Sequence, residues 1–279
     1  MQEGRAPILP LSTPILTDTI SDAMTISIIT ATYNSAATLR STFDSILRQT
    51  YRDIDYIVID GGSTDGTLDI IREYEPRFAG HLRWISEPDH GIYDAMNKGI
   101  RMAKGDVVGI LNSDDFYASN SVLSEIAKNI VDVDAVYGDL VFIDASDTSR
   151  VVRQWHGSQY QKGAFLKGWH PAHPTFYARK RLFDTMGAFD TTFKVSADFE
   201  LMLRFFERGD ITSRYIPMVF VKMRMGGEST GSIKKIIEGN RNVIRAFKKN
   251  SLPVSSLYPI RRLLPKAYNI LKNKIGRGR

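Results

Sequence analysis

The sequence predicts an α/β fold in which helices cover a central, largely parallel sheet. Between residues 26 and 111, short runs rich in valine and isoleucine alternate with segments whose apolar residues recur at helical spacing. This alternation is typical of a parallel sheet wrapped by helices. Polar clusters follow each of the four strand-like runs, at the strand ends where such sheets bind ligands. A chain of 279 residues is long enough to bury a full core around this sheet.

The first half of the chain supplies the predicted parallel strands. Residues 54–60 form an almost continuous apolar run, which indicates a central strand buried on both faces. Residues 36–49 place Leu39, Phe43 and Ile46 at helical spacing. Together these patterns predict strands at 26–32, 54–60, 82–86 and 106–111 and helices at 36–49, 67–74 and 93–103.

The pattern changes after Asp115. Strand-like and helix-like segments no longer alternate regularly, and residues 168–177 are rich in aromatic residues and histidine. The second half is therefore expected to differ in architecture from the first. We expect helices at 119–130, 179–186, 198–208 and 233–248 and strands at 135–143, 151–155 and 219–225.

Composition and charge exclude several classes of site. The chain has no cysteine, so disulfides, thiolate zinc sites and cysteine nucleophiles are excluded. It has no apolar run of about 18 or more residues, which argues against a membrane-spanning helix. The net charge of +6 comes from residues 241–279, which hold eleven Lys and Arg and no acidic residue. A basic balance that comes from one end does not predict a nucleic-acid partner.

The two ends are expected to lie outside the main domain. Residues 1–23 lack the basic start and unbroken apolar run of a secretory signal, so we expect a mobile extension. Residues 231–279 are expected to form a helical, basic C-terminal tail. Its part 251–279 mixes basic and apolar side chains, which fits an interfacial helix on an anionic membrane. A solvated, partly disordered terminus is the alternative.

The last strand-end cluster, 112–115, contains two adjacent carboxylates. Asp114 and Asp115 repel each other unless a cation is present. Oxygen ligands of this kind suit Mg²⁺ or Mn²⁺, which would also hold a diphosphate. A cap for the helix predicted at 119–130 is the alternative. The other three clusters are Thr32-Tyr33-Asn34, 60–65 and 87–91.

Two of these clusters, 60–65 and 87–91, present carboxylates that are not adjacent. Asp60 can accept hydrogen bonds from a nucleobase or ribose, and the two glycines after it let the backbone approach a ligand closely. A plain turn with a helix cap is the alternative, and the spacing of the dinucleotide fingerprint is missing. Asp89 can cap the next helix and also meet a ligand. On that helix, Asn97 and Lys98 either bind substrate or form its solvated face.

Charged side chains in the second half suggest a reacting group. Asp198 and Glu200 lie two apart at the start of an apolar helix and point to different faces, so one can act as a base while the other is structural. Interaction with the helix dipole is the alternative. His170 and His173 can bind sugar, metal or phosphate, or simply pack. Arg224 precedes two glycines, which suggests a mobile loop with a cation for a leaving diphosphate, or a surface arginine beside a turn.

These motifs together resemble glycosyltransferase family 2 over about residues 24–230. The resemblance implies a GT-A fold, which is a Rossmann-like mixed central sheet flanked by helices. It further implies a nucleotide-sugar-binding half at 24–115 and an acceptor-binding half at 116–230. The segments that carry the resemblance, in the family's order, are 27–34, 59–67, 86–89, 91–99 and 112–115.

The resemblance also implies roles for single residues. Asp60 would read the nucleobase, and Asp198 falls where the family has its catalytic base. The sequence departs from the family pattern at Asn112, where many members are acidic, and at Ala197, where a glutamate is usual. The nucleotide pocket would be lined by Thr32, Tyr33, Asn34 and Asp89. The metal motif would be Asp114 and Asp115. The departure at Asn112 leaves open which of these two carboxylates binds the ion and which binds the ribose.

The activity that the resemblance implies is inverting, metal-dependent transfer of one sugar. A nucleotide-diphosphate sugar, with a UDP-sugar favoured, would donate to a hydroxyl of a glycan or a lipid-linked acceptor, with Mn²⁺ or Mg²⁺. No Q-x-x-R-W motif occurs, which favours single transfer over polymerisation. We expect a role in bacterial-type cell-surface polysaccharide or glycolipid assembly, by a cytoplasmic protein that contacts the inner membrane face through 251–279.

Two other functions fit parts of the pattern. A sugar nucleotidyltransferase would need a glycine-rich, cationic loop after the first strand, and residues 31–35 contain neither glycine nor cation. A non-catalytic nucleotide-sugar-binding module has no need to retain Asp60, Asp114, Asp115 and Asp198 together.

Overall fold

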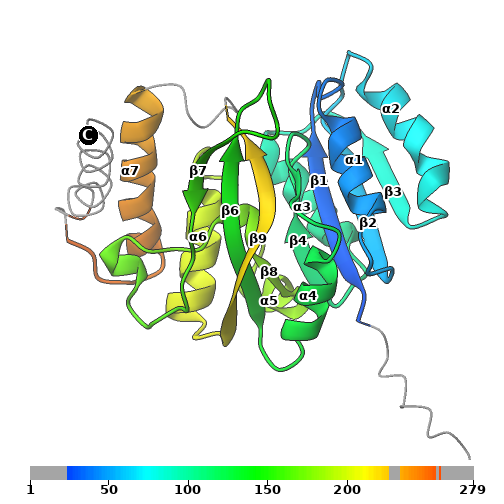
Figure 1. Ribbon diagram of the computed structural model, residues 1–279. Helices are drawn as coiled ribbons and strands as arrows, with labels where there is room; N and C mark the ends of the chain where they lie inside the picture. Colours follow the sequence, from blue (N-terminus) through cyan, green and yellow to red (C-terminus); the bar gives the residue numbers. More distant parts are fainter. Residues whose placement is uncertain (1–23, 226–232, 256–257, 259–279) are drawn as a thin grey trace, which may run out of the picture.

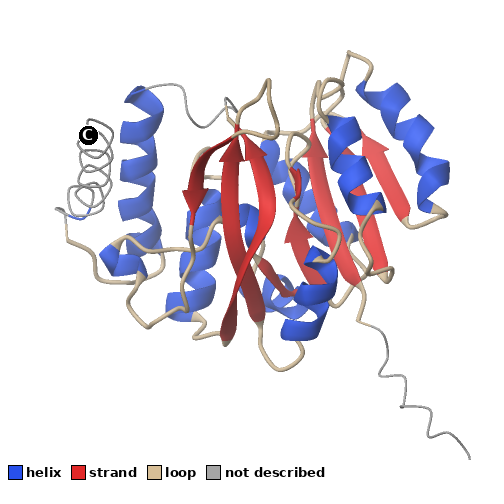
Figure 2. Ribbon diagram, viewed as in Figure 1, coloured by secondary structure: helices blue, strands red, loops and turns tan. Residues whose placement is uncertain are grey.

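The computed structural model describes residues 24–225, 233–255 and 258. These residues form one nine-stranded mixed sheet with helices on both faces (Figure 2). Along the sheet the strands follow the order β3-β2-β1-β4-β8-β6-β9-β5, and β7 pairs with β6. The predicted α/β class is confirmed.

The first four strands of the chain are parallel and adjacent. They are β1 (Ile26–Thr32), β2 (Ile54–Asp60), β3 (Leu82–Ser86) and β4 (Val107–Ile110). The helices between them are α1 (Leu39–Leu47), α2 (Thr67–Tyr74, extended by a 3₁₀ turn at Glu75–Phe78) and α3 (Ile92–Met102). All seven predicted elements are confirmed, with ends that shift by up to three residues.

The second half reverses direction once. The short strand β8 (Tyr177–Arg179) is antiparallel to β4 and to β6 (Ala135–Ile143), and β6 is parallel to β9 (Ser213–Arg224). Therefore β6 and β9 run in the same direction as β1 to β4. The other elements are β5 (Phe116–Tyr117), α4 (Val122–Asn129), β7 (Val151–Trp155), 3₁₀ turns at Phe165–Lys167 and His173–Thr175, α5 (Lys180–Met186), α6 (Ala197–Leu203), a π-helix at Arg204–Arg208 and α7 (Ile233–Lys249).

One strand expected in the second half was wrong in extent. Strand β9 begins six residues earlier than 219, because Ser213 pairs with Ala135 and extends the ladder along β6. Its first half is partly exposed and interrupted by a proline, so the local pattern does not mark it as a strand. The helix predicted at 198–208 is confirmed in extent, as α6 followed by the π-helix at Arg204–Arg208.

The sheet has a hydrophobic core on each face. Neighbouring residues of a strand point to opposite faces, so Ile29 and Ile57 pack with α3 and α6, whereas Ile28 and Val58 pack with α1 and α2. This arrangement explains why β1 and β2 read as continuous apolar runs. Helix α7, predicted as part of the tail, lies beside α6 (Figure 1). It buries Phe247 against Phe199 of that helix.

The described residues include no helix with the length and apolar composition that a membrane span requires. Residues 1–23, for which we expected a mobile extension, lie outside the described residues, as do 256–257 and 259–279 of the expected membrane-binding segment 251–279.

Gly109 of β4 tests the packing between the two halves of the sheet. A Cβ at this position would lie 2.0 Å from the ring of the fully buried Tyr177 on β8. We expect Gly109→Ala to destabilise the protein by about 1–3 kcal/mol, measured by chemical unfolding. Gly239→Ala in α7 is the control, because its Cβ would make an ordinary 3.6 Å contact with the Ser196 hydroxyl and helix propensity favours alanine. Equal stability of both variants would contradict this account.

Candidate active site

The polar clusters at the ends of the first three parallel strands are tied into one surface. The Gly61 amide donates to the Thr32 carbonyl at 2.9 Å, and the Glu87 amide donates to the Asp60 carbonyl at 3.0 Å. Asn34, in the left-handed region at φ 48°, accepts from the Thr64 amide at 2.9 Å. The predicted convergence of the strand ends is therefore present.

The fourth cluster joins the same edge through serine hydroxyls. Ser35 and Ser113 share a hydrogen bond of 2.9 Å between their Oγ atoms. Thr32, the last residue of β1, is buried, and its hydroxyl has no hydrogen-bond partner among the described residues. A buried, unpaired hydroxyl is uncommon in folded proteins, and a hydrogen bond to a ligand or water would satisfy it.

Asp60 holds the loop that follows β2. Its side chain is fully buried. Oδ2 accepts from the amides of Gly62 and Ser63 at 3.1 and 2.9 Å and from the Ser86 hydroxyl at 2.7 Å, while Oδ1 accepts from the Ser63 hydroxyl. Both oxygens are thus engaged within the protein, which matches the turn function that the sequence left open.

Asp89 and Tyr33 meet over Gly61. A Cβ on Gly61 would lie 2.5 Å from Asp89 Oδ2 and 3.5 Å from the Tyr33 ring. Asp89 Oδ1 accepts from the Gly91 amide at 2.8 Å, and in the described structure no group donates to Oδ2. The Tyr33 ring is 62% exposed. A free carboxylate oxygen and an exposed aromatic face therefore share one point at the strand ends.

Asn97 and Lys98 bind the protein rather than the open side of the site. The buried Asn97 amide donates to the Phe189 carbonyl at 2.8 Å and accepts from the Phe189 amide at 2.9 Å. Lys98 donates to the Pro88 carbonyl at 2.9 Å and forms an ion pair with Glu87 at 2.8 Å. The two residues fix loops on either side of α3, which is a different role from the substrate contact we expected.

The acidic pair lies just beyond β4. Asp115 is fully buried, and its Oδ2 accepts from the Asn112 amide at 2.9 Å. Its Oδ1 has no partner within the described residues. Burial and the neighbouring charge of Asp114 raise the pKa of Asp115 to about 8, and burial raises the pKa of Asp114, opposed by the charge of Arg224. A cation bound beside such a buried carboxyl group would strongly stabilise its ionised form.

Arg224 reaches this pair from the other half of the sheet. It lies at the end of β9 and donates to the Asp114 carbonyl and, at 3.0 Å, to the Ser41 hydroxyl. The guanidinium also lies over the Phe116 ring at 5.0 Å. The structure therefore places the predicted cation beside the predicted metal ligands; the glycines that follow it are outside the described residues.

The residues present can coordinate a divalent cation only if a bound ligand supplies some of the coordinating atoms. The described residues contain no group of three or more histidine or acidic side chains that could hold a metal alone. Two carboxylates, one with an unpaired buried oxygen, suit Mg²⁺ or Mn²⁺ that takes its other ligands from a diphosphate and water.

The two carboxylates of α6 have different surroundings, as their spacing predicts. Glu200 is buried, with ion-pair contacts of 3.1 Å to Arg204 and a 2.9 Å hydrogen bond from Asn250, so it is structural. Asp198 is partly exposed and accepts a hydrogen bond of 3.2 Å from the Tyr93 hydroxyl. Of the two, Asp198 is the one free to exchange a proton with a ligand.

The two candidate histidines, His170 and His173, also lie in different surroundings. Burial lowers the pKa of His173, opposed by the charge of Asp198, so a neutral imidazole lies in the field of that carboxylate. Its ring is edge-on to Phe189 at 5.4 Å. His170 packs between the rings of Trp155 and Phe199, at 5.1 and 5.4 Å. His173 belongs to the surroundings of Asp198, whereas His170 belongs to an aromatic cluster.

Sequence reasoning gave no role to Tyr93. The tyrosine lies within a motif we noted, but its partner Asp198 is 105 residues away. Local spacing carries no information on such a contact, and only the packing of α3 against the second half reveals it.

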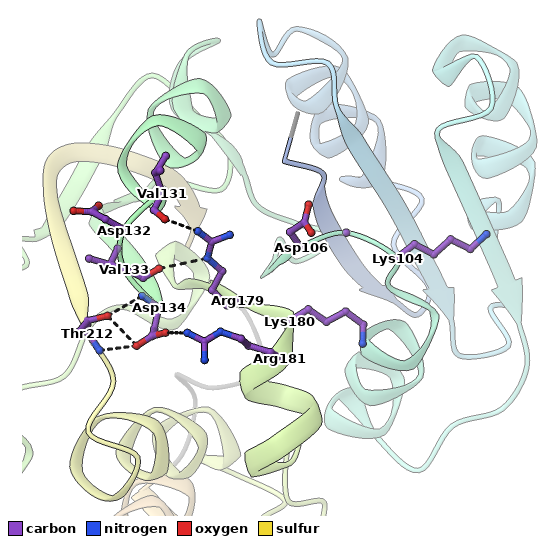
Figure 3. A pocket seen from close by; sticks show the side chains of 11 residues that line it. Lys104, Asp106, Val131, Asp132, Val133, Asp134, Arg179, Lys180, Arg181 and Thr212 are labelled. Atoms are coloured by element: carbon purple, nitrogen blue, oxygen red, sulfur yellow. Dashed lines mark hydrogen bonds and ion pairs between the residues drawn. The ribbon is translucent and has the colours of Figure 1, made fainter. Parts of the chain in front are cut away.

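A cavity of about 790 Å³ lies at the opposite edge of the sheet (Figure 3). Its lining precedes β4, β6 and β9, so it is remote from the strand ends described above. Its polar groups are paired: Asp134 binds Arg181 and Thr212, and Arg179 donates to backbone carbonyls (Figure 3). These contacts join the segments that precede β6 and β9 to the end of β8 and the start of α5, so these side chains have a structural role within the second half.

Known proteins share both the sequence pattern and the fold. A protein of Mycobacterium bovis (strain BCG / Pasteur 1173P2) named PGL/p-HBAD biosynthesis glycosyltransferase is 32% identical over 213 residues, covering 75% of this chain and 80% of that protein. The structure of S. aureus TarS 1-349 in complex with UDP-GlcNAc superposes with a TM-score of 0.61 at 17% identity, covering 85% of this chain and 69% of that one.

A second solved structure, the mannosyltransferase PcManGT from Pyrobaculum calidifontis in complex with GDP-Man and Mn²⁺, gives a TM-score of 0.60 at 21% identity, covering 87% of this chain and 69% of that one. Residues 27–196 match the family described as Glycosyl transferase family 2. The family match, the identity to the mycobacterial protein and the shared GT-A fold agree, and the chain is a glycosyltransferase that belongs to glycosyl transferase family 2.

Proposed function

We propose that this glycosyltransferase moves one sugar from a nucleotide-diphosphate sugar to an acceptor hydroxyl, with a divalent cation and with inversion at the anomeric carbon. The observation that carries the proposal is the unpaired, buried oxygen of Asp115 beside Asp114 and Arg224, at the edge where four strand ends meet. A diphosphate with its cation satisfies all three groups. The solved relatives in complex with UDP-GlcNAc and with GDP-Man and Mn²⁺ support this choice of donor.

The nucleobase is assigned to Asp89 and Tyr33. Asp60 was the residue expected to read the base, but both of its oxygens are engaged in its own loop. Asp89 Oδ2 is free above Gly61 and can accept from a ring N–H, while the exposed Tyr33 ring offers a stacking surface. Uracil and guanine carry such a ring N–H and cytosine does not, which favours a UDP- or GDP-type donor over a CDP-type donor.

Exchange of Asp89 tests the base assignment. Asp89→Asn keeps the size of the side chain but replaces one accepting oxygen by a donor, which can pair with the ring nitrogen of cytosine. We expect affinity for UDP with Mn²⁺ to fall about 10-fold and the preference for UDP over CDP to shrink, measured by calorimetry. Asp69→Asn, on the exposed face of α2, is the control. Unchanged base preference in the Asp89 variant would refute the assignment.

Asp114 and Asp115 would hold the cation. When bound, Mg²⁺ or Mn²⁺ supplies positive charge that stabilises the leaving diphosphate. Arg224, which is held against Asp114 by its hydrogen bond to the backbone, adds a fixed positive charge on the same side. Asn112 orients Asp115 by its donated hydrogen bond and leaves the second carboxylate oxygen open.

The raised pKa of Asp115 predicts how the metal-free protein responds to pH. The folded state holds this proton more tightly than the unfolded chain, because the pKa rises from 3.8 to about 8. Stability should therefore fall as the pH rises through this range, and Asp115→Asn should flatten that slope. A gain of about 1 kcal/mol in the variant would raise Tm by roughly 2–4 °C at the upper end of this range.

The measurement is thermal unfolding between about pH 5 and pH 8, without and with Mn²⁺ and UDP. The ligands should restore stability at high pH in the parent protein and not in the Asp115→Asn variant. The same slope in both proteins would show that Asp115 does not carry the effect.

Asp198 is proposed to act as the base. It accepts the proton of the acceptor hydroxyl while the oxygen of that hydroxyl attacks the anomeric carbon. The bond from that carbon to the diphosphate breaks, and its electrons leave with the diphosphate. A single displacement from the opposite face inverts the configuration, so an α-linked donor gives a β-linked product. Neutral His173 lies within the electrostatic reach of the carboxylate and does not compete as a cation.

Removal of this carboxylate should affect turnover and spare donor binding. We expect Asp198→Asn to lower kcat for transfer by about 10²–10⁴-fold, with nearly unchanged affinity for the nucleotide diphosphate, measured by steady-state kinetics and calorimetry. Asp184→Asn, at an exposed ion pair on α5, is the matched control. Near-normal transfer by the Asp198 variant would mean that another group takes the proton.

The acceptor is proposed to be a glycan or a lipid-linked molecule of cell-surface polysaccharide or glycolipid assembly. The mycobacterial relative bears a name that refers to PGL/p-HBAD biosynthesis, which supports a glycolipid. The basic and apolar composition of residues 251–279 supports contact with an anionic membrane surface, where such an acceptor would be found.

A further inference from the structure

Tyr93 lies between the two halves of the site. It is in the first turn of α3, and its hydroxyl donates to Asp198 Oδ1 at 3.2 Å. Its ring packs on Phe189 with centroids 5.4 Å apart and planes at 31°. One turn later on the same helix, Asn97 clamps the Phe189 backbone through two hydrogen bonds. The position of the hydroxyl is therefore set by α3 and by the loop that α3 holds.

The protonation state of Tyr93 suits a permanent donor. Burial raises the pKa of Tyr93, and the charge of Asp198 raises it further. The backbone of Asp198 and Ala197 acts in the opposite direction and is a smaller cause. The phenol therefore keeps its proton, and its hydroxyl donates it to the carboxylate.

The carboxylate is held on one side only. In the described residues, Oδ1 receives the Tyr93 hydrogen bond and Oδ2 receives none. The titratable groups that the structure places against Asp198 are Tyr93 from α3 and His173 from the 3₁₀ turn at His173–Thr175. Of these two groups, Tyr93 is the one whose hydrogen bond to the carboxylate is present in the described structure.

We propose that Tyr93 is a positioning residue for Asp198: its hydroxyl fixes Oδ1, stabilises the ionised carboxylate and turns Oδ2 toward the acceptor hydroxyl. The proposal rests on the proposed function of Asp198 as the base. It adds that the orientation of the base depends on α3, whose start is joined to the nucleotide side through Gly91 and Asp89. The donor and acceptor halves thus share one rigid helix.

Tyr93→Phe tests the hydroxyl while it keeps the ring on Phe189. We expect kcat for transfer to fall about 10–100-fold, the range that one hydrogen bond to a charged group supports. The affinity for nucleotide diphosphate should stay unchanged. The acid limb of the pH–kcat profile should move to higher pH, because the carboxylate loses the donor that stabilises its ionised form. Tyr51→Phe, which removes a hydroxyl bonded to the remote Met24 carbonyl, is the control.

A graded measurement covers the case in which Tyr93→Phe does not fold. Fluorinated tyrosine incorporated at position 93 keeps the size and the hydroxyl but makes the phenol a stronger donor. The acid limb should then move to lower pH. A profile that stays in place in either protein, with kcat near that of the parent, would overturn the proposal.

Asp198→Asn in the same assays separates this inference from the function on which it rests. Normal transfer by Asp198→Asn would refute the base assignment itself. Loss of transfer in Asp198→Asn together with parent-like kinetics in Tyr93→Phe would refute the positioning role of Tyr93 alone. A fall in nucleotide affinity without a shift of the pH profile would assign Tyr93 to α3 packing and would also refute it.

Discussion

The parallel pairing of β1 with β2 and β4 is the constraint on which the site depends. In a parallel ladder all carboxyl ends lie at one edge, so every residue that follows a strand is brought to the same line. The ladder is buried on both faces, and a slip of one residue would exchange the two apolar faces of β1. Core packing on both faces thus fixes the register and, with it, the relative positions of the polar clusters.

The single reversal at β8 extends this edge into the second half. Because β8 is antiparallel to both of its neighbours, β6 and β9 again point their carboxyl ends toward the clusters. The end of β9 pairs with β5, which directly follows Asp115, and this pairing delivers Arg224 to the acidic pair. A cation from residue 224 and carboxylates from residues 114 and 115 meet through sheet topology and not through nearness in the chain.

The sequence was sufficient for what depends on local pattern. It predicted the elements of the first half and the gathering of polar residues at the strand ends, because hydrophobic periodicity reports directly on strands and helices. It also predicted that Asp198 and Glu200 would differ in surroundings, since residues two apart on a helix face different ways. It missed β8 and the start of β9, whose existence depends on pairing with distant strands.

The role of a polar side chain could not be predicted from the sequence where a distant part of the protein forms its hydrogen bonds. Asn97 and Lys98 have the polarity of ligand-binding residues, but a backbone 92 residues away and a neighbouring loop use their hydrogen bonds. Asp60 is similar, because its neighbours Ser63 and Ser86 satisfy it. A sequence motif shows that a polar side chain is required at a position. It does not distinguish a side chain that stabilises a loop from one that binds a ligand.

Asn112 shows how a departure from the family pattern can be read physically. Its amide donates to Asp115, a carboxyl that burial and Asp114 already make difficult to ionise. An acidic side chain at position 112 would replace that donor by a third negative charge and would raise the cost of ionising Asp115 further. With an amide there, one oxygen of Asp115 is held and the other remains available, so the pair needs only one cation and one diphosphate to be satisfied.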